Sequence, residues 1–193
     1  MPNSRLRLTG LIAATILTTR LALAASPADF TVESPTDGSK FHLADAKGKY
    51  VALHFLLKTE CPFCLRHTRD YAKRSATLPG VVQVFLKPDG PEEIRKWSAN
   101  LGDETSRQLT VYRDADAALA KAYEIPDGYQ FHGEVVHFPA LVLLDPEGRE
   151  VFRYVGKNNS DRFSFEQLAT KVSELKPAGA STAAKATSES KQP

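Results

Sequence analysis

The strongest constraint on the fold is an almost continuously apolar segment, Tyr50 to Leu57 (YVALHFLL). An unbroken apolar run of this length is typical of a strand buried on both faces, whereas a half-exposed strand alternates apolar and polar residues. A second such run, Val81 to Leu86 (VVQVFL), follows a helical pattern over Pro62 to Leu78. Strand, helix and strand in this order predict a parallel crossover, and therefore an α/β domain.

Further elements extend this pattern on both sides. We expect an N-terminal β-hairpin around the turn-rich quartet Pro35 to Gly38, and antiparallel strands on either side of the turn Asp145 to Gly148. Pro126 to His137 fits neither period and is predicted to be a long loop, a kind of segment that often carries function. The other expected elements are a short strand over 110–112 and helices from Pro91 to Leu101, from the capping residue Asp114 to Tyr123, and from Phe165 to Lys176. Together they predict a central mixed β-sheet with helices on both faces.

The two ends of the chain are predicted to lie outside this fold. In residues 1–24, Arg5 and Arg7 precede an apolar stretch and a small-x-small cleavage site at Ala22-Leu23-Ala24, as in an export signal. The alternative is an uncleaved anchor, but the 12 apolar residues from Leu8 fall short of the roughly 20 that a membrane span needs. Residues 177–193 are rich in Ala, Ser, Thr and Lys without apolar periodicity, so we expect a disordered tail. Residues 25–176 remain as one folded domain.

Charge and cysteine content exclude two classes of protein. The net charge of +2 becomes −1 when the export signal, with its three arginines and no acid, is set aside. A nucleic-acid binder normally has a strongly basic face, so no nucleic-acid partner is expected. Two cysteines rule out a disulfide-dense scaffold, and they stand together as Cys61-Pro62-Phe63-Cys64.

This CPFC motif lies where a buried strand leads into a helix, and that position suits redox chemistry. Ligands of open α/β sheets bind beyond the carboxyl ends of the strands. A sulfur in the first helical turn faces free backbone N–H groups and the positive end of the helix dipole, which stabilise a thiolate. We therefore expect Cys61 to be the exposed nucleophile and Cys64 the resolving thiol of a dithiol–disulfide cycle.

Two other interpretations of the cysteines remain open. The first is a purely structural disulfide, although so small a loop stabilises little by entropy. The second is a zinc site in which His132 and His137 join the cysteines as C-x2-C…H-x4-H. The 67 residues between the two pairs exceed zinc-finger spacing, and thiolates in an oxidising compartment tend to pair instead.

With these motifs in place, the chain resembles the thioredoxin-like fold. More narrowly, it resembles the redoxin branch that groups alkyl hydroperoxide reductase C and thiol-specific antioxidant proteins with exported thioredoxin-like reductases. The resemblance covers about Phe30 to Lys176 and implies that Cys61 is the nucleophile, Cys64 the resolver and Pro139 a cis-proline that positions the substrate chain. It rests on the hairpin followed by Lys47-Gly48-Lys49-Tyr50, the strand-to-CPFC junction, Phe138-Pro139, and Leu143 to Arg149 (LLDPEGR). An ordinary trans proline in a turn is the alternative for Pro139.

Departures from the family patterns bear on the activity. The peroxiredoxin motif P-x-x-x-T-x-x-C would place Pro and Thr at His54 and Lys58 for Cys61, or at Leu57 and Cys61 for Cys64. Neither alignment restores the motif, which weakens the case for peroxide reduction, and Glu60 replaces the Trp that precedes the first cysteine of thioredoxins.

Several supporting residues have two interpretations each. His54 lies on the buried strand near the place of the buried acid of thioredoxins, where it could move a proton for Cys64 or be an inert core histidine. His67 could lie near the sulfurs or on a solvated helix face. Glu60 disfavours and Lys58 favours a Cys61 thiolate. Tyr129, Phe131 and His132 form one wall of a substrate groove or a structural flap.

We expect an exported, periplasmic or secreted thiol–disulfide oxidoreductase with Cys61, Cys64, Pro139 and His54 at its site. It needs no cofactor and no metal, acts on a protein thiol or disulfide, and exchanges electrons with a thiol system or a membrane reductase. A monomer is expected. The alternatives are a peroxiredoxin-like thiol peroxidase that reduces hydroperoxides at Cys61, and a non-catalytic metal carrier or interaction module on the same fold.

Overall fold

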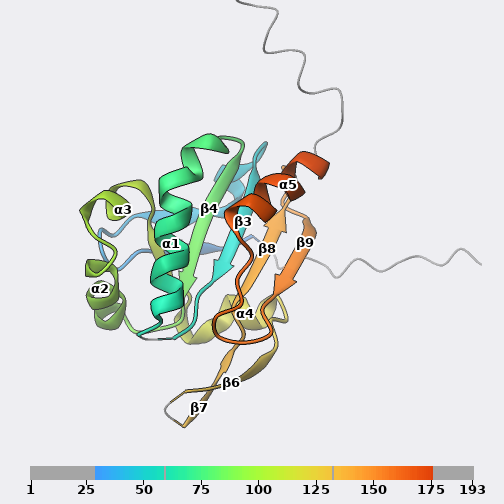
Figure 1. Ribbon diagram of the computed structural model, residues 1–193. Coiled ribbons are helices and arrows are strands. Elements are labelled where there is room, and N and C mark those ends of the chain that lie inside the picture. The colour runs from blue at the N-terminus through green and yellow to red at the C-terminus, as the bar shows by residue number, and fades with distance from the viewer. Residues whose placement is uncertain (1–28, 59, 132, 176–193) are drawn as a thin grey trace, which may run out of the picture.

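A five-stranded mixed sheet forms the centre of the protein (Figure 1). The structure is a computed structural model that describes residues 29–58, 60–131 and 133–175. The strand order is β5-β4-β3-β8-β9; β3, β4 and β5 are parallel, whereas β8 is antiparallel to both β3 and β9. The bounds of these strands are β3 Tyr50–Phe55, β4 Val81–Lys87, β5 Val111–Arg113, β8 Ala140–Leu144 and β9 Glu150–Val155. The predicted α/β fold class is thus confirmed.

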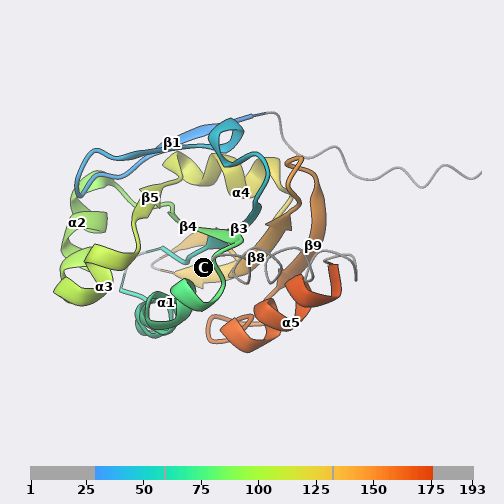
Figure 2. The ribbon, with the colours of Figure 1, turned by 90° about the horizontal axis from the view of Figure 1, so that it is seen from above.

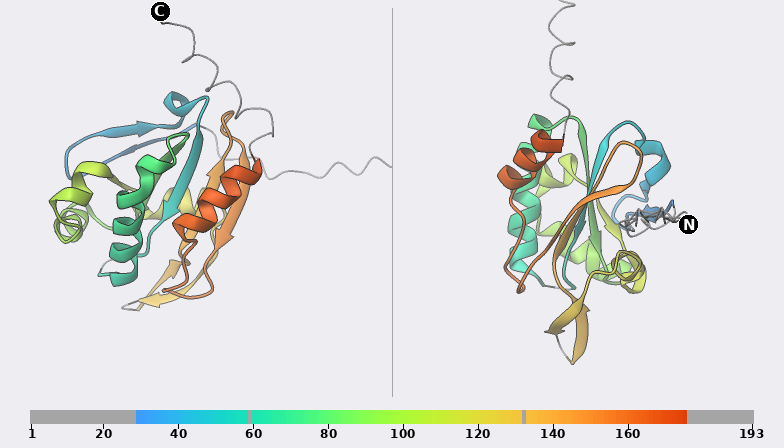
Figure 3. Two further views of the ribbon diagram at one scale, coloured as in Figure 1. Left: turned by 45° about the horizontal axis from the view of Figure 1, so that its top comes forward. Right: turned by 90° about the vertical axis from the view of Figure 1, so that its right-hand side faces the viewer.

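Two layers of helices and strands cover the sheet, one on each face (Figures 2 and 3). One face carries α1 (Pro62–Arg74) and α5 (Phe165–Leu175), with α2 (Pro91–Ala99) and α3 (Asp103–Gln108) beside α1. The other face carries α4 (Ala118–Ala122) and the predicted N-terminal hairpin of β1 (Thr31–Glu33) and β2 (Lys40–His42).

The central strand β3 shows why its sequence is apolar throughout. Ala52 packs into the core cluster under α1 and α5, whereas Val51, Leu53 and Phe55 pack into the cluster under the hairpin and α4. Leu53 and Phe55 are almost fully buried, and burial of such a side chain contributes about 1.5–3 kcal/mol. Both faces of β3 therefore hold the two layers to the sheet.

One prediction about local structure is wrong, and one helix was not predicted. Residues 126–137 do not form a loop but a second hairpin, of β6 (Asp127–Phe131) and β7 (Glu134–His137). It projects from the body of the protein, with Val135 54% exposed while Val136 and His137 at the base of β7 are buried, so burial does not alternate along the strand (Figure 1). The short helix α3 (sequence DETSRQ) was not predicted because its sequence has no apolar stripe.

Asp114 caps a helix as predicted, but the backbone N–H groups that it accepts lie five and six residues further along the chain. Its carboxylate accepts the N–H groups of Leu119 and Ala120 at 2.8 and 3.0 Å. Asp116 and Ala117 have φ of 56° and 53°, which kinks the chain so that α4 begins only at Ala118.

The predicted export signal and the predicted tail lie outside the described residues. Within the described ranges, no helix combines the length and apolar character that crossing a membrane requires.

Candidate functional site

The two cysteines lie at the N-terminus of α1, just beyond the carboxyl end of β3, as the sequence predicted. Cys61 is the capping residue of the helix: its Sγ accepts the N–H of Cys64 at 3.1 Å, and Pro62 follows at the first helical position, where a missing N–H costs nothing. The two residues form a disulfide with a Cα–Cα distance of 5.2 Å. Cys61 is 7% exposed and Cys64 0%, so the first sulfur is the one that a substrate can reach.

Arg162 lies over the disulfide, a contact that sequence analysis did not predict. It belongs to the segment between β9 and α5, and its Nη2 lies 3.5 Å from Cys61 Sγ and 3.2 Å from Cys64 Sγ. Burial lowers the pKa of its guanidinium to about 10, with nearby Asp161 opposing, so Arg162 stays cationic at neutral pH. A separation of 98 residues along the chain from Cys64 explains why no local motif reveals this contact.

His54 on β3 and His67 on α1 form a histidine pair. His54 is 1% exposed and packs its ring on Phe85, with centroids 4.3 Å apart. Its Nε2 lies 2.8 Å from Gln83 Oε1 and its Nδ1 lies 3.1 Å from His67 Nε2. Because an amide oxygen only accepts, this pattern assigns the His54 proton to Nε2, so that His67 donates from Nε2 and keeps a lone pair on Nδ1.

Both imidazoles are neutral at pH 7. Burial lowers the pKa of His54 to about 4, and the hydrogen bond that His54 donates to Gln83 opposes this shift. Burial, followed by the proximity of His54 and Arg162, holds the pKa of His67 well below its usual value. The solvated interpretation of His67 is therefore wrong: the residue is half-buried, and its ring faces the core because α1 lays that side of the helix on β3 and β4.

The predicted cis-proline is also corrected. The described residues contain no cis peptide bond, so Phe138–Pro139 is trans. Backbone pairing holds this corner: the Phe138 N–H donates to the Pro126 carbonyl at 2.9 Å, and the Gly156 N–H donates to the Pro139 carbonyl at 2.8 Å. Pro139 still lines a small pocket together with His54, His67 and Arg162.

Gly156 joins this corner to the segment that carries Arg162. A methyl group added to Gly156 would lie 2.4 Å from the backbone oxygen of Asp161 and 2.8 Å from the ring of Pro139. Only glycine therefore allows the chain after β9 to turn back closely enough to place Arg162 over the sulfurs.

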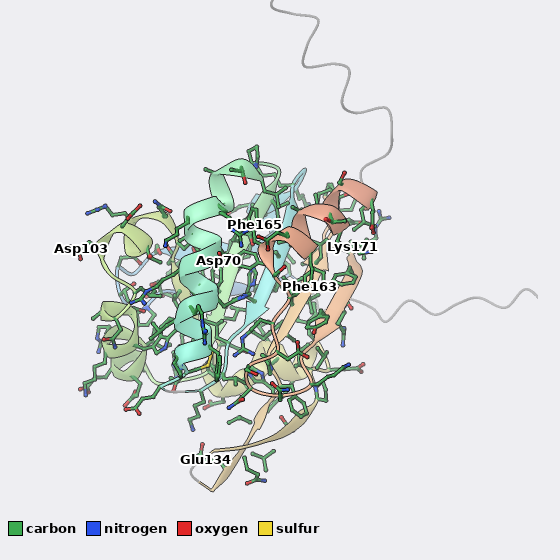
Figure 4. The ribbon with its side chains drawn as sticks, viewed as in Figure 1. Asp70, Asp103, Glu134, Phe163, Phe165 and Lys171 are labelled. Atoms are coloured by element: carbon green, nitrogen blue, oxygen red, sulfur yellow. A yellow bond between two sulfur atoms is a disulfide. The ribbon has the colours of Figure 1, made fainter. Side chains whose placement is uncertain are left out.

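The chain between β3 and α1 is held from two sides. Lys87, fully buried, donates to the Leu57 carbonyl at 2.9 Å and to Asp89 at 2.6 Å, and its ammonium lies 5.1 Å from the Trp97 ring centroid. Burial lowers the pKa of Lys87, whereas Asp89 raises it. On the other side Lys58 forms an ion pair with Glu134 at the tip of the β6–β7 hairpin (Figure 4).

The remaining candidates are less central. Glu60 is exposed, and the side chains of Tyr129, Phe131 and His132 lie outside the described part of the structure. His137 is buried on β7 and its Nδ1 lies 2.7 Å from the Phe138 carbonyl. Among the described residues, no three His, Cys, Asp or Glu side chains come together as metal ligands would.

Known proteins share both this sequence pattern and this fold. The AhpC/TSA family model matches residues 24–151. A thiol peroxidase of Oceanobacillus iheyensis is 29% identical over 102 residues, 53% of this chain, and the chain spans only 62% of that relative. A protein of Mycobacterium tuberculosis H37Rv named as a peroxiredoxin is 25% identical over 138 residues, 69% of this chain and 85% of the relative.

Solved structures with similar folds include a peroxiredoxin and a thioredoxin. The 2-Cys peroxiredoxin of Plasmodium vivax has a TM-score of 0.63 at 20% identity, covering 79% of this chain and 94% of its own. The exposed lipoprotein thioredoxin of Streptococcus pneumoniae has a TM-score of 0.59 at 22% identity, covering 77% of this chain and 100% of its own. These likenesses show that the fold is thioredoxin-like. The sequence match adds the family: this chain belongs to the AhpC/TSA family.

Proposed function

We propose that the protein is an exported thiol–disulfide oxidoreductase in which Cys61 is the nucleophile and Cys64 the resolving thiol. In the reducing direction, the Cys61 thiolate attacks a substrate disulfide R–S–S–R′, forms a Cys61–S–S–R bond and expels R′S⁻. The Cys64 thiolate then attacks Cys61 Sγ, forms the Cys61–Cys64 disulfide and expels RS⁻. The protein loses two electrons and the substrate gains them; the reverse sequence oxidises a dithiol.

One observation carries this proposal: a disulfide at the tip of α1 whose outer sulfur retains some exposure and whose two sulfurs both contact Arg162. A thiolate at Cys61 would face the positive end of the helix and a guanidinium at once. Both interactions favour the charged nucleophile, and neither requires a cofactor.

The histidine pair is proposed to serve the resolving step. His67 keeps an unprotonated Nδ1, and as a neutral imidazole it can accept the proton that the Cys64 thiol must lose before it attacks. His54 acts through His67 as a positioning residue, because its hydrogen bonds to Gln83 and His67 fix which nitrogen of His67 carries the proton. Pro139 is proposed to form part of the wall that contacts the substrate.

Trapping of mixed disulfides tests the assignment of the cysteines. In Cys64→Ser the mixed disulfide on Cys61 cannot be resolved, so a Cys61-linked adduct should accumulate and should disappear on reduction. Cys61→Ser is the matched control and should trap little, since Cys64 is fully buried. Equal trapping by the two variants would overturn the assignment.

A thiol peroxidase is the second candidate, favoured by the relatives with that name and by the cation beside Cys61. Here the Cys61 thiolate would attack a hydroperoxide ROOH, giving Cys61 sulfenic acid and ROH. Cys64 would then form the disulfide and release water. Stopped-flow oxidation of reduced Cys64→Ser by hydrogen peroxide, no faster than that of a free thiolate, would exclude this candidate.

Export is supported by the sequence of residues 1–24 and is tested by cell fractionation of the full-length chain. A protein lacking its first 24 residues in the exported fraction is the expected result. An intact N-terminus in the cytoplasmic fraction would contradict it.

A further inference from the structure

A groove opens between α1 and the segment before α5. It has a volume of about 440 Å³ and is lined by Phe63, Arg66 and His67 on α1 and by Ser160, Arg162 and Ser164 across from them. This volume lies within the range of pockets that hold small ligands. Arg162 lines the groove and also contacts both sulfurs, so this one residue connects the groove to the redox pair.

The groove carries positive charge that the protein does not neutralise. No described carboxylate forms an ion pair with Arg66, whose guanidinium lies 5.2 Å from the Phe63 ring centroid. No described carboxylate pairs with Arg162 either, although the residue is half-buried; its Nε is buried without a described partner. The desolvation of a guanidinium is costly unless an anion compensates for it.

The acids near the groove already have other partners. Asp70, which also lines the groove, is paired with Arg74 one helical turn further along α1 (Figure 4). Asp161 accepts the Tyr154 hydroxyl at 2.6 Å and the Lys157 N–H at 2.9 Å. The Ser160 hydroxyl donates to Asn158 at 2.7 Å, and Arg162 already donates to the Asp161 carbonyl and to both sulfurs. The Arg66 guanidinium is thus left to bind a ligand, beside the positive charge of Arg162, and this arrangement suits a carboxylate.

We propose that this groove binds the carboxylate of a small anionic thiol or disulfide and thereby gives the redox pair a preference for anionic substrates. The inference rests on the proposed function and names its substrate class. Two electrons pass from the dithiol to the bound disulfide: Cys61 forms a bond to one substrate sulfur, the other leaves as an anionic thiolate, and Cys64 releases the second by forming the Cys61–Cys64 disulfide.

The test uses three small disulfides of similar size and different charge. Reduced protein is mixed with 3,3′-dithiodipropionate (dianion), bis(2-hydroxyethyl) disulfide (neutral) or cystamine (dication), and each rate constant is divided by that of 2-mercaptoethanol with the same disulfide. We expect the normalised rate to fall in this order. The preference should weaken at high ionic strength, because salt screens exposed charges.

Arg66→Gln tests ligand binding in the groove separately from the redox chemistry, because no described contact joins Arg66 to either sulfur. It should lower the ratio of dianion rate to neutral rate by about two- to fivefold and leave the neutral rate unchanged. Lys73→Gln is the matched control: Lys73 is an exposed cation on the same helix that does not line the groove, and its loss should leave the ratio unchanged.

The outcomes distinguish this inference from the function on which it rests. Equal normalised rates for the three disulfides, or equal effects of Arg66→Gln and Lys73→Gln, would overturn the anionic site while leaving the oxidoreductase in place. No reaction with any of the three would overturn the proposed function itself.

Discussion

Replacement of Arg162 by Gln should make Cys61 a markedly weaker nucleophile at neutral and acidic pH. The substitution keeps a polar side chain of similar length but removes the charge that lies 3.5 Å from Cys61 Sγ. In the reduced protein this charge faces a thiolate, whereas a neutral disulfide gains far less from it. The variant therefore loses stabilisation mainly of the reduced, ionised state.

The size of the effect follows from the geometry. At about 4 Å, opposite unit charges attract by about 1 kcal/mol in bulk water and by about 4 kcal/mol at an effective dielectric constant of about 20. Arg162 is half-buried, so we expect about 1.4 to 2.7 kcal/mol. That is about a tenfold to hundredfold loss in the thiolate–thiol equilibrium constant, and a reduction potential about 30 to 60 mV lower.

Two measurements check this expectation. The rate of alkylation by iodoacetamide is followed from pH 4 to pH 9, and the midpoint of the profile should move upwards in Arg162→Gln. The reduction potential is measured by equilibration with glutathione buffers and should become more negative. Arg66→Gln is the control, because it removes a neighbouring guanidinium for which no contact with the sulfurs is recorded.

An alkylation profile of Arg162→Gln that superimposes on that of the parent protein would refute the reasoning. Circular dichroism of both proteins shows whether the variant is folded, so that a loss of structure is not mistaken for a loss of charge.

Three further predictions concern groups around the site. His54→Gln should make the free energy of unfolding in urea depend less on pH in the acid range. The pKa of His54 is lowered to about 4 in the folded protein, so its neutral form contributes stability that is complete above about pH 6.5 and is lost as the pH falls to about 4. The loss in the parent protein should be about 3 kcal/mol. Lys87→Met should cost about 3–5 kcal/mol in urea unfolding, because it leaves Asp89 buried without its lysine, and Lys87→Met with Asp89→Asn should recover part of that loss. Gly156→Ala should lower the free energy of unfolding by about 1–3 kcal/mol and slow Cys61 alkylation, because the added methyl displaces the segment that carries Arg162. Reduced stability with an unchanged alkylation rate would contradict the proposed effect on Arg162.

Sequence patterns predicted the sheet and the cysteine pair because both are local. The apolar run of β3 and the CPFC motif lie within 15 consecutive residues, so periodicity and spacing suffice to place them. The β6–β7 hairpin escaped prediction because burial on β7 is confined to the adjacent residues Val136 and His137, which produces no apolar alternation in the sequence. The mistaken cis-proline was expected both from the place of Pro139 just ahead of a buried strand and from the family resemblance, and neither determines the isomer.

Distant segments contribute the groups that surround the sulfurs, and the sequence patterns did not predict these contacts. His54 was a candidate because it lies on the strand that leads to Cys61, but its contact with His67 depends on how α1 lies over β3 and β4. Arg162 and Lys87 sit in segments whose local sequence gives no reason to connect them with the cysteines. Only the packing of helices and strands brings them there.

The position of Arg162 has a consequence for biosynthesis. A growing polypeptide contains both cysteines long before Arg162, 98 residues after Cys64, has been synthesised. Until the segment between β9 and α5 docks, Cys61 lacks this cation and has only the N-terminal end of α1 to stabilise a thiolate. The full stabilisation that we propose for the Cys61 thiolate is therefore reached only when folding is complete.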